Sequence, residues 1–426
     1  MRLYPFATLA MIALPIAFGC SAAGGDKGAA SLDGTDPGAK PGGPGGGDAG
    51  ADTGFHLPGG DPDGGLGGIG DASGPPLDPT KDNDGDGYVY ADDCDDTNKL
   101  INPGAYDVAA DKVDNDCNGT VDDVDACDTG LKLLAADGLD FAKSLHLCRQ
   151  TTEAATGKSK TWGVISAVIQ TVDGSDKPLA RQIGLEPHWG TAATMKAKEG
   201  ETMVVLSTGS ARVPGQPEYM KPLDMVFGDK NTGHENTPPT GWPKNTSGCP
   251  SPATNTANDS VSVKLKIRVP TNASSFAYDF DFYSSEYIDF VCSSYNDTYV
   301  ALLTTKAPLD PKNAGNISFD ATGGPVNVNS GFFEVCTPGS AASGKSFACK
   351  LGTGELVGTG FEGDGNQDGA TSWLRTKAGV VPGEIIELTF AIWNTGDHIL
   401  QSTILLDNFQ WDATPTTGGP VTDRPK

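Results

Sequence analysis

Apolar and polar residues alternate in short runs between residues 161 and 412, and Gly, Asn and Pro separate the runs. Period-two alternation is typical of strands that bury only one face. The clearest runs cover residues 261–269, 276–282, 386–392 and 404–409. So many runs predict a mainly β fold, an antiparallel β-sandwich of jelly-roll type over residues 160–413. Long loops, such as the one from Pro214 to Pro252, must decorate it.

One short amphipathic helix is predicted before the β-rich region. Leu134, Phe141, Leu145 and Cys148 fall at helical spacing in this part of the chain. We therefore expect a helical connector over residues 129–159. His146 is the only histidine in it, and we expect this side chain on the helix surface or in the core rather than at a metal.

The first 19 residues have the pattern of a secretory signal, because Arg2 precedes an apolar run that ends at Phe18. The run is too short for a membrane span. Its end, AFGC at residues 17–20, resembles a bacterial lipobox, although leucine is usual at the first position. That resemblance implies a lipid on Cys20 and attachment to the outer membrane or cell surface. Cleavage after Ala23 is the alternative, and it would give a secreted protein.

Residues 20–80 consist mainly of Gly, Ala, Asp and Pro, with few apolar side chains. Such a composition cannot bury enough apolar surface to offset the entropy of ordering the chain. We expect a disordered tether here. We also expect residues 414–426 to be a disordered tail.

The chain carries a formal net charge of −25, and 15 of its acids are the Asp residues between Asp82 and Asp128. This charge would repel nucleic acid, so we expect no nucleic-acid partner. It suits divalent cations instead.

Two calcium-loop frames lie in this acidic segment, which we call the cassette (residues 81–128). An EF-hand loop places oxygen ligands at positions 1, 3, 5, 7, 9 and 12 and a glycine at position 6. The first frame contains Asp82, Asp84, Asp86, the carbonyl of Tyr88 and Asp93. The second contains Asp114, Asp116, Asn118, Thr120, Asp122 and Asp125. A solvated acidic loop would not explain Gly87 and Gly119 at both sixth positions, so the frames predict about two bound calcium ions.

The cassette leaves no room for two pairs of flanking helices, so we do not expect an EF-hand pair. Its motifs are D-x-D-G-D-G-Y, D-C-D-D, N-P-G-A and D-N-D-C-x-G-x-x-D-D. In these motifs the cassette resembles the Asp-rich metal-binding repeat of bacterial surface proteins, and more distantly the thrombospondin type 3 calcium repeats. Asn118 stands where an Asp is usual, which should weaken the second site.

Eight cysteines follow Cys20, and an even number in an exported chain implies up to four disulfides. Spacing alone does not fix the connectivity. Pairing of neighbours in sequence would join Cys94 to Cys117, Cys127 to Cys148, Cys249 to Cys292 and Cys336 to Cys349.

The β-rich region carries a second resemblance. Residues 280–291 read FDFYSSEYIDFV, residues 295–299 read YNDTY, and LSTGSA at 206–211 and LDNF at 406–409 agree with the same family. Together they resemble the choice-of-anchor L domain over roughly residues 160–412. The resemblance implies a β-rich bacterial surface domain with variable anchoring and no established activity.

The β-rich region offers candidate ligands for a metal site of its own, because acids and amides lie near the expected strand ends. The candidate ligands are Glu286, Asp289, Asn296 and Asp297. The alternative is that they are ordinary turn and loop-capping residues.

The sequence contains neither a G-x-S-x-G nor an H-E-x-x-H motif, and its five histidines show no metal-ligand spacing. We therefore expect a non-enzymatic, calcium-binding surface lipoprotein whose β-sandwich binds polysaccharide, matrix or surface proteins. A secreted hydrolase acting on polysaccharide or peptide is one alternative, and a metal-scavenging surface protein is another. Hard oxygen ligands favour calcium over copper or zinc.

Overall fold

The computed structural model describes residues 78–123, 126–192, 195–222, 234–320, 323–362 and 368–425. The predicted signal segment, Cys20 and the tether as far as residue 77 lie outside these residues, and so does Asp125. Residues from Ala72 onward belong to a single unit.

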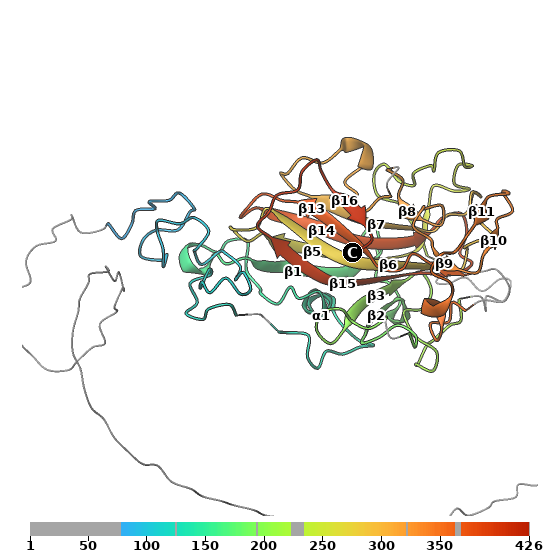
Figure 1. Cartoon of the computed structure of the whole chain (residues 1–426), viewed down its shortest axis with the longest axis horizontal. Coiled ribbons are helices and arrows are strands. Elements are labelled where there is room, and N and C mark those ends of the chain that lie inside the picture. Colours follow the sequence, from blue (N-terminus) through green and yellow to red (C-terminus); the bar gives the residue numbers. More distant parts are fainter. Residues whose placement is uncertain are drawn as a thin grey trace, which may run out of the picture. The chain divides into compact units, whose positions relative to one another are not determined.

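Two antiparallel sheets form the β-rich region (Figure 1). The first has the strand order β1 (Gly163–Gln170), β5 (Ala257–Arg268), β14 (Ile385–Asn394), β7 (Thr298–Thr304) and β8 (Val326–Asn327), with β4 (Glu235–Asn236) beside β5. The second has the order β16 (Val421–Asp423), β13 (Leu374–Gly379), β6 (Ser275–Ser284), β15 (Ser402–Asp412), β3 (Met203–Ser207) and β2 (Ile183–Glu186). In this sheet β12 (Gly369–Ala370) pairs with β6 and with β9 (Val335–Cys336).

Four 3-10 turns and a small hairpin lie in the connections. The turns are η1 (Gly157–Ser159), η2 (Ala180–Gln182), η3 (Pro311–Asn313) and η4 (Gly354–Leu356). The hairpin consists of β10 (Gly339–Ser340) and β11 (Ser346–Phe347).

The predicted β-sandwich is confirmed by the contacts between the two sheets. The alternating apolar side chains of β5 and β14 share one buried core with those of β6 and β15. Tyr278 of the second sheet meets Phe390 of the first, with ring centroids 4.9 Å apart, and Phe280 lies 5.1 Å from Tyr299 in the same way. The apolar half of each alternating run therefore faces the space between the sheets. We call this region, residues 160–425, the head.

Strand β6 is buried on both faces, unlike an ordinary sandwich strand. Its outer face lies under the loops that carry Trp189 and Phe361, and these side chains pack around Tyr283 in a second apolar cluster. Asp279 and Asp281 share this outer face, so both are removed from water.

The predicted helix is confirmed, and α1 spans Gly138–Ser144. Asp137 caps its first turn by accepting hydrogen bonds from two backbone N–H groups, and Phe141 and Leu145 pack into the core. His146 lies just beyond the helix, with φ of 60°, where its side chain is partly buried.

All four sequence-neighbour disulfides are present. They join Cys94 to Cys117, Cys127 to Cys148, Cys249 to Cys292, and Cys336 to Cys349.

The expectation of a disordered tail over residues 414–426 is wrong. Strand β16 pairs with β13 at the edge of the second sheet. Arg424 then donates hydrogen bonds of 2.6 Å to the carbonyls of Thr371 and Phe332 and pairs with Glu334 at 3.1 Å. These bonds explain why a Gly/Pro-rich segment without an apolar pattern is ordered.

Candidate metal centre

The cassette is fixed to the head by its NPGA segment, residues 102–105. Thr271, in the turn between β5 and β6, donates its N–H to the carbonyl of Gly104 at 3.0 Å and its hydroxyl to Asn102 at 2.7 Å. A side chain at position 104 would fall 2.2 Å from the Tyr88 hydroxyl, so only glycine fits there. The acidic loops therefore stand at a defined place beside the sandwich.

The first loop folds as the calcium frame predicts. Gly87 adopts φ of +98°, a conformation that L side chains rarely take, and so allows the sharp turn at position 6. One oxygen of Asp84 accepts the N–H of Asp86 at 3.1 Å, and one oxygen of Asp86 accepts that of Tyr88 at 2.8 Å. Each carboxylate thus uses one oxygen to shape the loop and keeps its second oxygen for the centre.

Asp84, Asp86 and Asp93 each bring a carboxylate oxygen to one point, with the three atoms within 4.8 Å of one another. In each residue the Oδ2 atom is buried and has no hydrogen-bond partner in the described part of the chain. Burial raises the pKa of Asp86 to about 6, and burial together with neighbouring carboxylates raises those of Asp84 and Asp93. Three buried, mutually repelling oxygens without a donor are the environment that a cation stabilises.

Asp82 and Tyr88, the other members of the first frame, support this centre. Asp82 accepts the N–H groups of Gly85 at 2.7 Å and Gly87 at 3.0 Å, and it forms a second acidic group with Asp84 and Asp96. Sequence reasoning missed Asp96, which accepts the N–H of Asn83 at 2.8 Å.

Tyr88, whose carbonyl is the predicted ligand, is also an anchor. Its ring is 1% exposed, and its hydroxyl donates to the carbonyl of Lys160 just before β1. Burial raises the pKa of Tyr88 to about 12, so the hydroxyl keeps its proton.

The second loop has the same backbone turns but assembles a different set of acids. Asp114 accepts the N–H of Gly119 at 2.9 Å, and Asn118 donates its N–H to Asp116 at 3.1 Å. The acids that converge within 4.8 Å are Asp107, Asp116 and Asp123. Of these, only Asp116 belongs to the predicted frame.

Other members of the second frame have different contacts. Asp122 accepts the N–H of Lys112 at 3.0 Å, Thr120 donates its N–H to the side chain of Asn118 at 2.8 Å, Asp114 belongs to none of the acid clusters of the described residues, and Asp125 is not described. Asp107 and Asp123 could have been suspected only from their acidity, because neither stands at an EF-hand ligand position.

Basic and amide groups fill the second cluster. The guanidinium of Arg149 contacts the carboxylate of Asp116 and lies 3.9 Å from that of Asp123. The side-chain amide of Asn118 donates to Asp116 at 3.1 Å and to Asp123 at 3.2 Å. Burial and a hydrogen bond to Asp123 raise the pKa of Asp107 to about 6, and the same bond lowers the pKa of Asp123.

Of the four candidate ligands of the head, Glu286 and Asp297 contact each other, whereas Asp289 lies apart from them at the surface. Glu286, Asn296 and Asp297 are buried, whereas Asp289 is exposed. Asp297 donates its N–H to Glu286 at 3.1 Å and accepts the Ser402 hydroxyl at 2.7 Å. Burial raises the pKa of Glu286 to about 8 and that of Asp297 well above its usual range. In the described residues no cluster of three acids includes any of the four.

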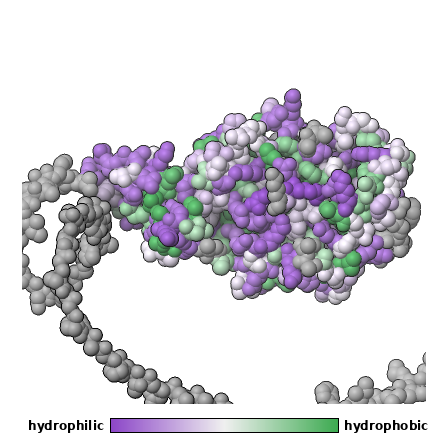
Figure 2. All heavy atoms as spheres, in the orientation of Figure 1, coloured by the Kyte–Doolittle hydropathy of each residue, from purple (hydrophilic) through white to green (hydrophobic). Residues whose placement is uncertain are grey.

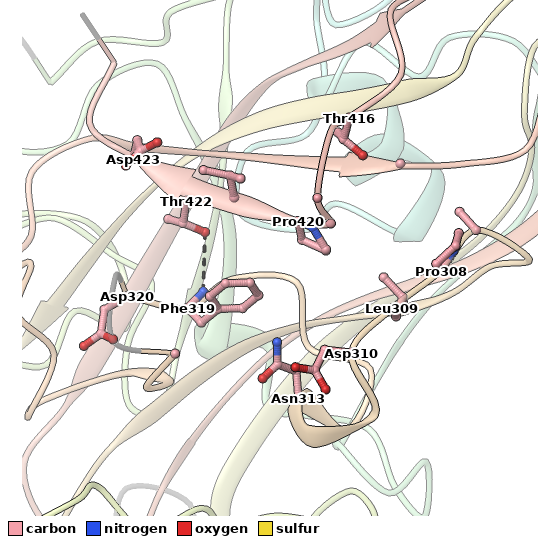
Figure 3. A pocket seen from close by; sticks show the side chains of 16 residues that line it. Pro308, Leu309, Asp310, Asn313, Phe319, Asp320, Thr416, Pro420, Thr422 and Asp423 are labelled. Carbon is pink, nitrogen blue, oxygen red and sulfur yellow. Dashed lines mark hydrogen bonds between the residues drawn. The ribbon is translucent and has the colours of Figure 1, made fainter.

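A cavity of about 810 Å³ lies beside β16 at the edge of the second sheet, between the loop that follows β7 and the C-terminal segment (Figure 3). The backbone N–H of Phe319 donates to Thr422 at 3.4 Å across its floor. Asp310 in its wall already caps η3. The cavity lacks the converging unpartnered oxygens that distinguish the first loop.

The hydrophilic surface of the cassette is consistent with a metal site in it. The segment that begins the cassette, blue in Figure 1, is hydrophilic on the face that Figure 2 shows. No helix of the described residues has the length and apolar character to cross a bilayer.

The fold and the acidic loops define an antiparallel β-sandwich protein with a metal-binding type of cassette. The chain belongs to the choice-of-anchor L domain family, whose model matches residues 181–410. Before it, residues 93–123 match a family described as Putative metal-binding motif, of the copper-binding MopE type. No curated protein and no solved structure matches the chain. Both families are surface-protein domains and fit an extracellular or cell-surface protein.

The metal-binding match begins at Asp93 and so leaves out Asp82, Asp84 and Asp86. The structure joins these residues to the matched segment, because Asp93 meets Asp84 and Asp86.

Proposed function

We propose that the chain is a non-enzymatic, calcium-binding surface lipoprotein, anchored through Cys20, whose head binds polysaccharide or matrix. One observation carries the calcium assignment, the convergence of three unpartnered, buried carboxylate oxygens from Asp84, Asp86 and Asp93. Burying charged oxygens without a partner is costly, and a cation removes that cost.

The donor set favours calcium. All ligand atoms of this cluster are carboxylate oxygens, which hard cations prefer. Cys94 and Cys117 lie beside Asp93, but their disulfide leaves no thiolate for copper or zinc. The carbonyl of Tyr88 and water would complete the six to eight oxygens that calcium takes.

The role of calcium would be structural. Asp84 and Asp86 come from the beginning of the first loop and Asp93 from its end, next to the Cys94–Cys117 disulfide. An ion among them would cross-link these segments and replace mutual repulsion by attraction. The cassette would then form a stiff junction between the N-terminal segment and the head.

Calorimetric titration of the oxidised full chain with calcium tests this assignment. Asp93→Asn should lower the affinity by about tenfold or more, because it removes a charged ligand that is 8% exposed. Asp92→Asn is the matched control, since its carboxylate lies outside the cluster and pairs only loosely with Lys158 at 4.0 Å. Equal losses in the two variants would overturn the assignment of the first loop.

The choice of metal needs its own experiment. Zinc or copper added to the calcium-loaded chain should not displace calcium at equal concentration. If zinc or copper displaces calcium and Asp93→Asn abolishes this displacement, the first loop is a transition-metal site and the chain is a metal scavenger.

Adhesion is supported by the surface-type domains and not by a described ligand site. The oxidised chain is mixed with cell envelopes and purified exopolysaccharide in calcium and in EDTA, with a melting curve as the folding control. Saturable binding is expected, and binding that EDTA and Asp93→Asn both remove would make the chain a calcium-dependent adhesin. Absence of binding under every condition would overturn the adhesive role.

The non-enzymatic assignment can be overturned as well. Hydrolysis of polysaccharide or peptide by the purified chain would do so if Glu286→Gln or Asp297→Asn abolished turnover while the melting curve stayed unchanged.

A further inference from the structure

The backbone of Arg149 is held against the head, next to the disulfide that joins Cys148 to Cys127 of the cassette. Its carbonyl accepts the N–H of Val164, in β1, at 2.8 Å. Gly163, with φ of +145°, lets this carbonyl approach, since a Cβ there would lie 2.6 Å from it. The guanidinium carbon stands 5.4 Å from the centre of the Trp162 ring.

The charged end of Arg149 lies among the acids of the second loop. It contacts Asp116, whose side chain is completely buried, and approaches Asp123. Arginine is suited to this position, because its planar group serves two carboxylates and keeps its charge when buried. The guanidinium of Arg149 therefore supplies a positive charge to two of the three clustered acids, Asp116 and Asp123.

A comparison of equivalent positions shows what Arg149 changes. At position 3, the Oδ2 of Asp84 has no partner in the described residues, whereas the Oδ2 of Asp116 receives Arg149 and the amide of Asn118. At position 5, Asp86 offers another unpartnered oxygen, whereas Asn118 offers two N–H donors. At these two positions the first loop presents only oxygen acceptors, whereas the second loop also contains N–H donors from Asn118 and Arg149.

We propose that Arg149 is the resident cation of the second loop, so that the chain binds one divalent ion and not two. The second loop is closed by this ion pair and holds the cassette to the head whether or not metal is present. The part of this inference that concerns the ion count rests on the proposed calcium site in the first loop.

The ion count is measured by equilibrium dialysis of the oxidised full chain against labelled calcium. The wild type should hold one ion. The pair of changes Asn118→Asp and Arg149→Gln gives the second loop acceptors at the same positions as the first, and this variant should hold two ions. Two ions in the wild type, or one in a folded double variant, would overturn the role of Arg149.

The closing role is measured without metal. In EDTA, Arg149→Gln should lower the melting temperature of the cassette by several degrees, and Arg149→Lys should recover part of the loss because it restores the charge. Lys158→Gln is the control. Lys158 is 67% exposed, and its ion pair with Asp92 is long, at 4.0 Å. Equal melting of Arg149→Gln and the wild type in EDTA would overturn the closing role.

The two proposals fail in different ways. If the wild type binds no ion, the calcium assignment of the first loop falls, and the EDTA melting curves still decide whether Arg149 closes the second loop.

Discussion

In the first loop of the cassette, Asp84, Asp86 and Asp93 point unpartnered oxygens at one another, whereas a buried acid of the head has basic partners. Asp279 of β6 pairs with Lys198 at 2.8 Å and with Arg375 at 3.3 Å. Burial raises the pKa of Glu286 and that of Asp297, which favours their protonated forms. The number of acids in a region therefore says little about metal binding.

The two regions also differ in what stabilises them. The head has a continuous apolar core between two sheets, whereas the described cassette has little beyond Tyr88 and Ala105 that is both apolar and buried. A segment of this size without a core needs disulfides or ions to remain folded. The following predictions test this division, from the largest expected effect to the smallest.

Phe390→Ala should destabilise the head by about 3–5 kcal/mol, because it leaves a cavity where Phe390 meets Tyr278. Denaturant unfolding in calcium and in EDTA measures the loss, which should be equal in the two solutions. A loss that differs between calcium and EDTA would mean that the stability of the head, like that of the cassette, depends on the ion.

Removal of the Cys94–Cys117 disulfide by serine at both positions should cost the cassette about 2–4 kcal/mol and sharply weaken calcium binding, because the bridge lies beside Asp93. Calorimetry measures the affinity. Serine at Cys336 and Cys349, a bridge within the head, is the matched control and should leave the affinity unchanged. The same weakening in both variants would contradict the local role of the first bridge.

The melting temperature of the head should fall as the pH rises from about 5 to 9. Burial raises the pKa of Glu286 from 4.5 to about 8, so the folded state holds its proton more tightly than the unfolded state. This contribution is complete below pH 4.5 and is lost as the pH passes through 8. Asp281 and Asp407, with pKa values raised to about 7, act in the same direction.

Calorimetric scans in EDTA follow this fall without interference from calcium. Glu286→Gln should flatten the pH dependence, and Glu387→Gln, whose carboxylate is 41% exposed, should not. An unchanged slope in Glu286→Gln would show that this carboxyl is ionised in the folded head.

Tyr88→Phe should cost the cassette about 1 kcal/mol, because it removes the hydrogen bond to the Lys160 carbonyl and leaves that acceptor without its donor. Thermal melting in EDTA measures the change. Tyr90→Phe is the control. Because Tyr90 is 42% exposed, this variant should have the same melting temperature as the wild type. A larger loss in Tyr90→Phe would contradict the anchoring role of Tyr88.

The features that could be predicted from the sequence are those with local causes. Alternation along β5, β6 and β14 depends on neighbours two residues apart, and it gave the correct sandwich. The first loop closes within 12 residues, so its frame from Asp82 to Asp93 could be counted directly. The disulfides joined neighbours because each closes a short segment.

The features that could not be predicted have distant causes. Arg149 reaches Asp116 from 33 positions further along the chain, and nothing between them signals the contact. Asp107 replaces the expected ligands of the second loop because it follows the NPGA segment docked on the head. Thr422 and Arg424 order the C-terminal segment through partners that lie about 50 to 100 positions earlier.

Strand β16 has a consequence for the behaviour of the head in solution. It is only three residues long, yet it covers the outer hydrogen-bonding edge of β13, which would otherwise be an open end of the second sheet. Open edges recruit strands from other molecules and lead to aggregation. Because β16 has three residues and β13 has six, the pairing leaves a shorter open edge than β13 alone would, which disfavours edge-to-edge pairing between copies.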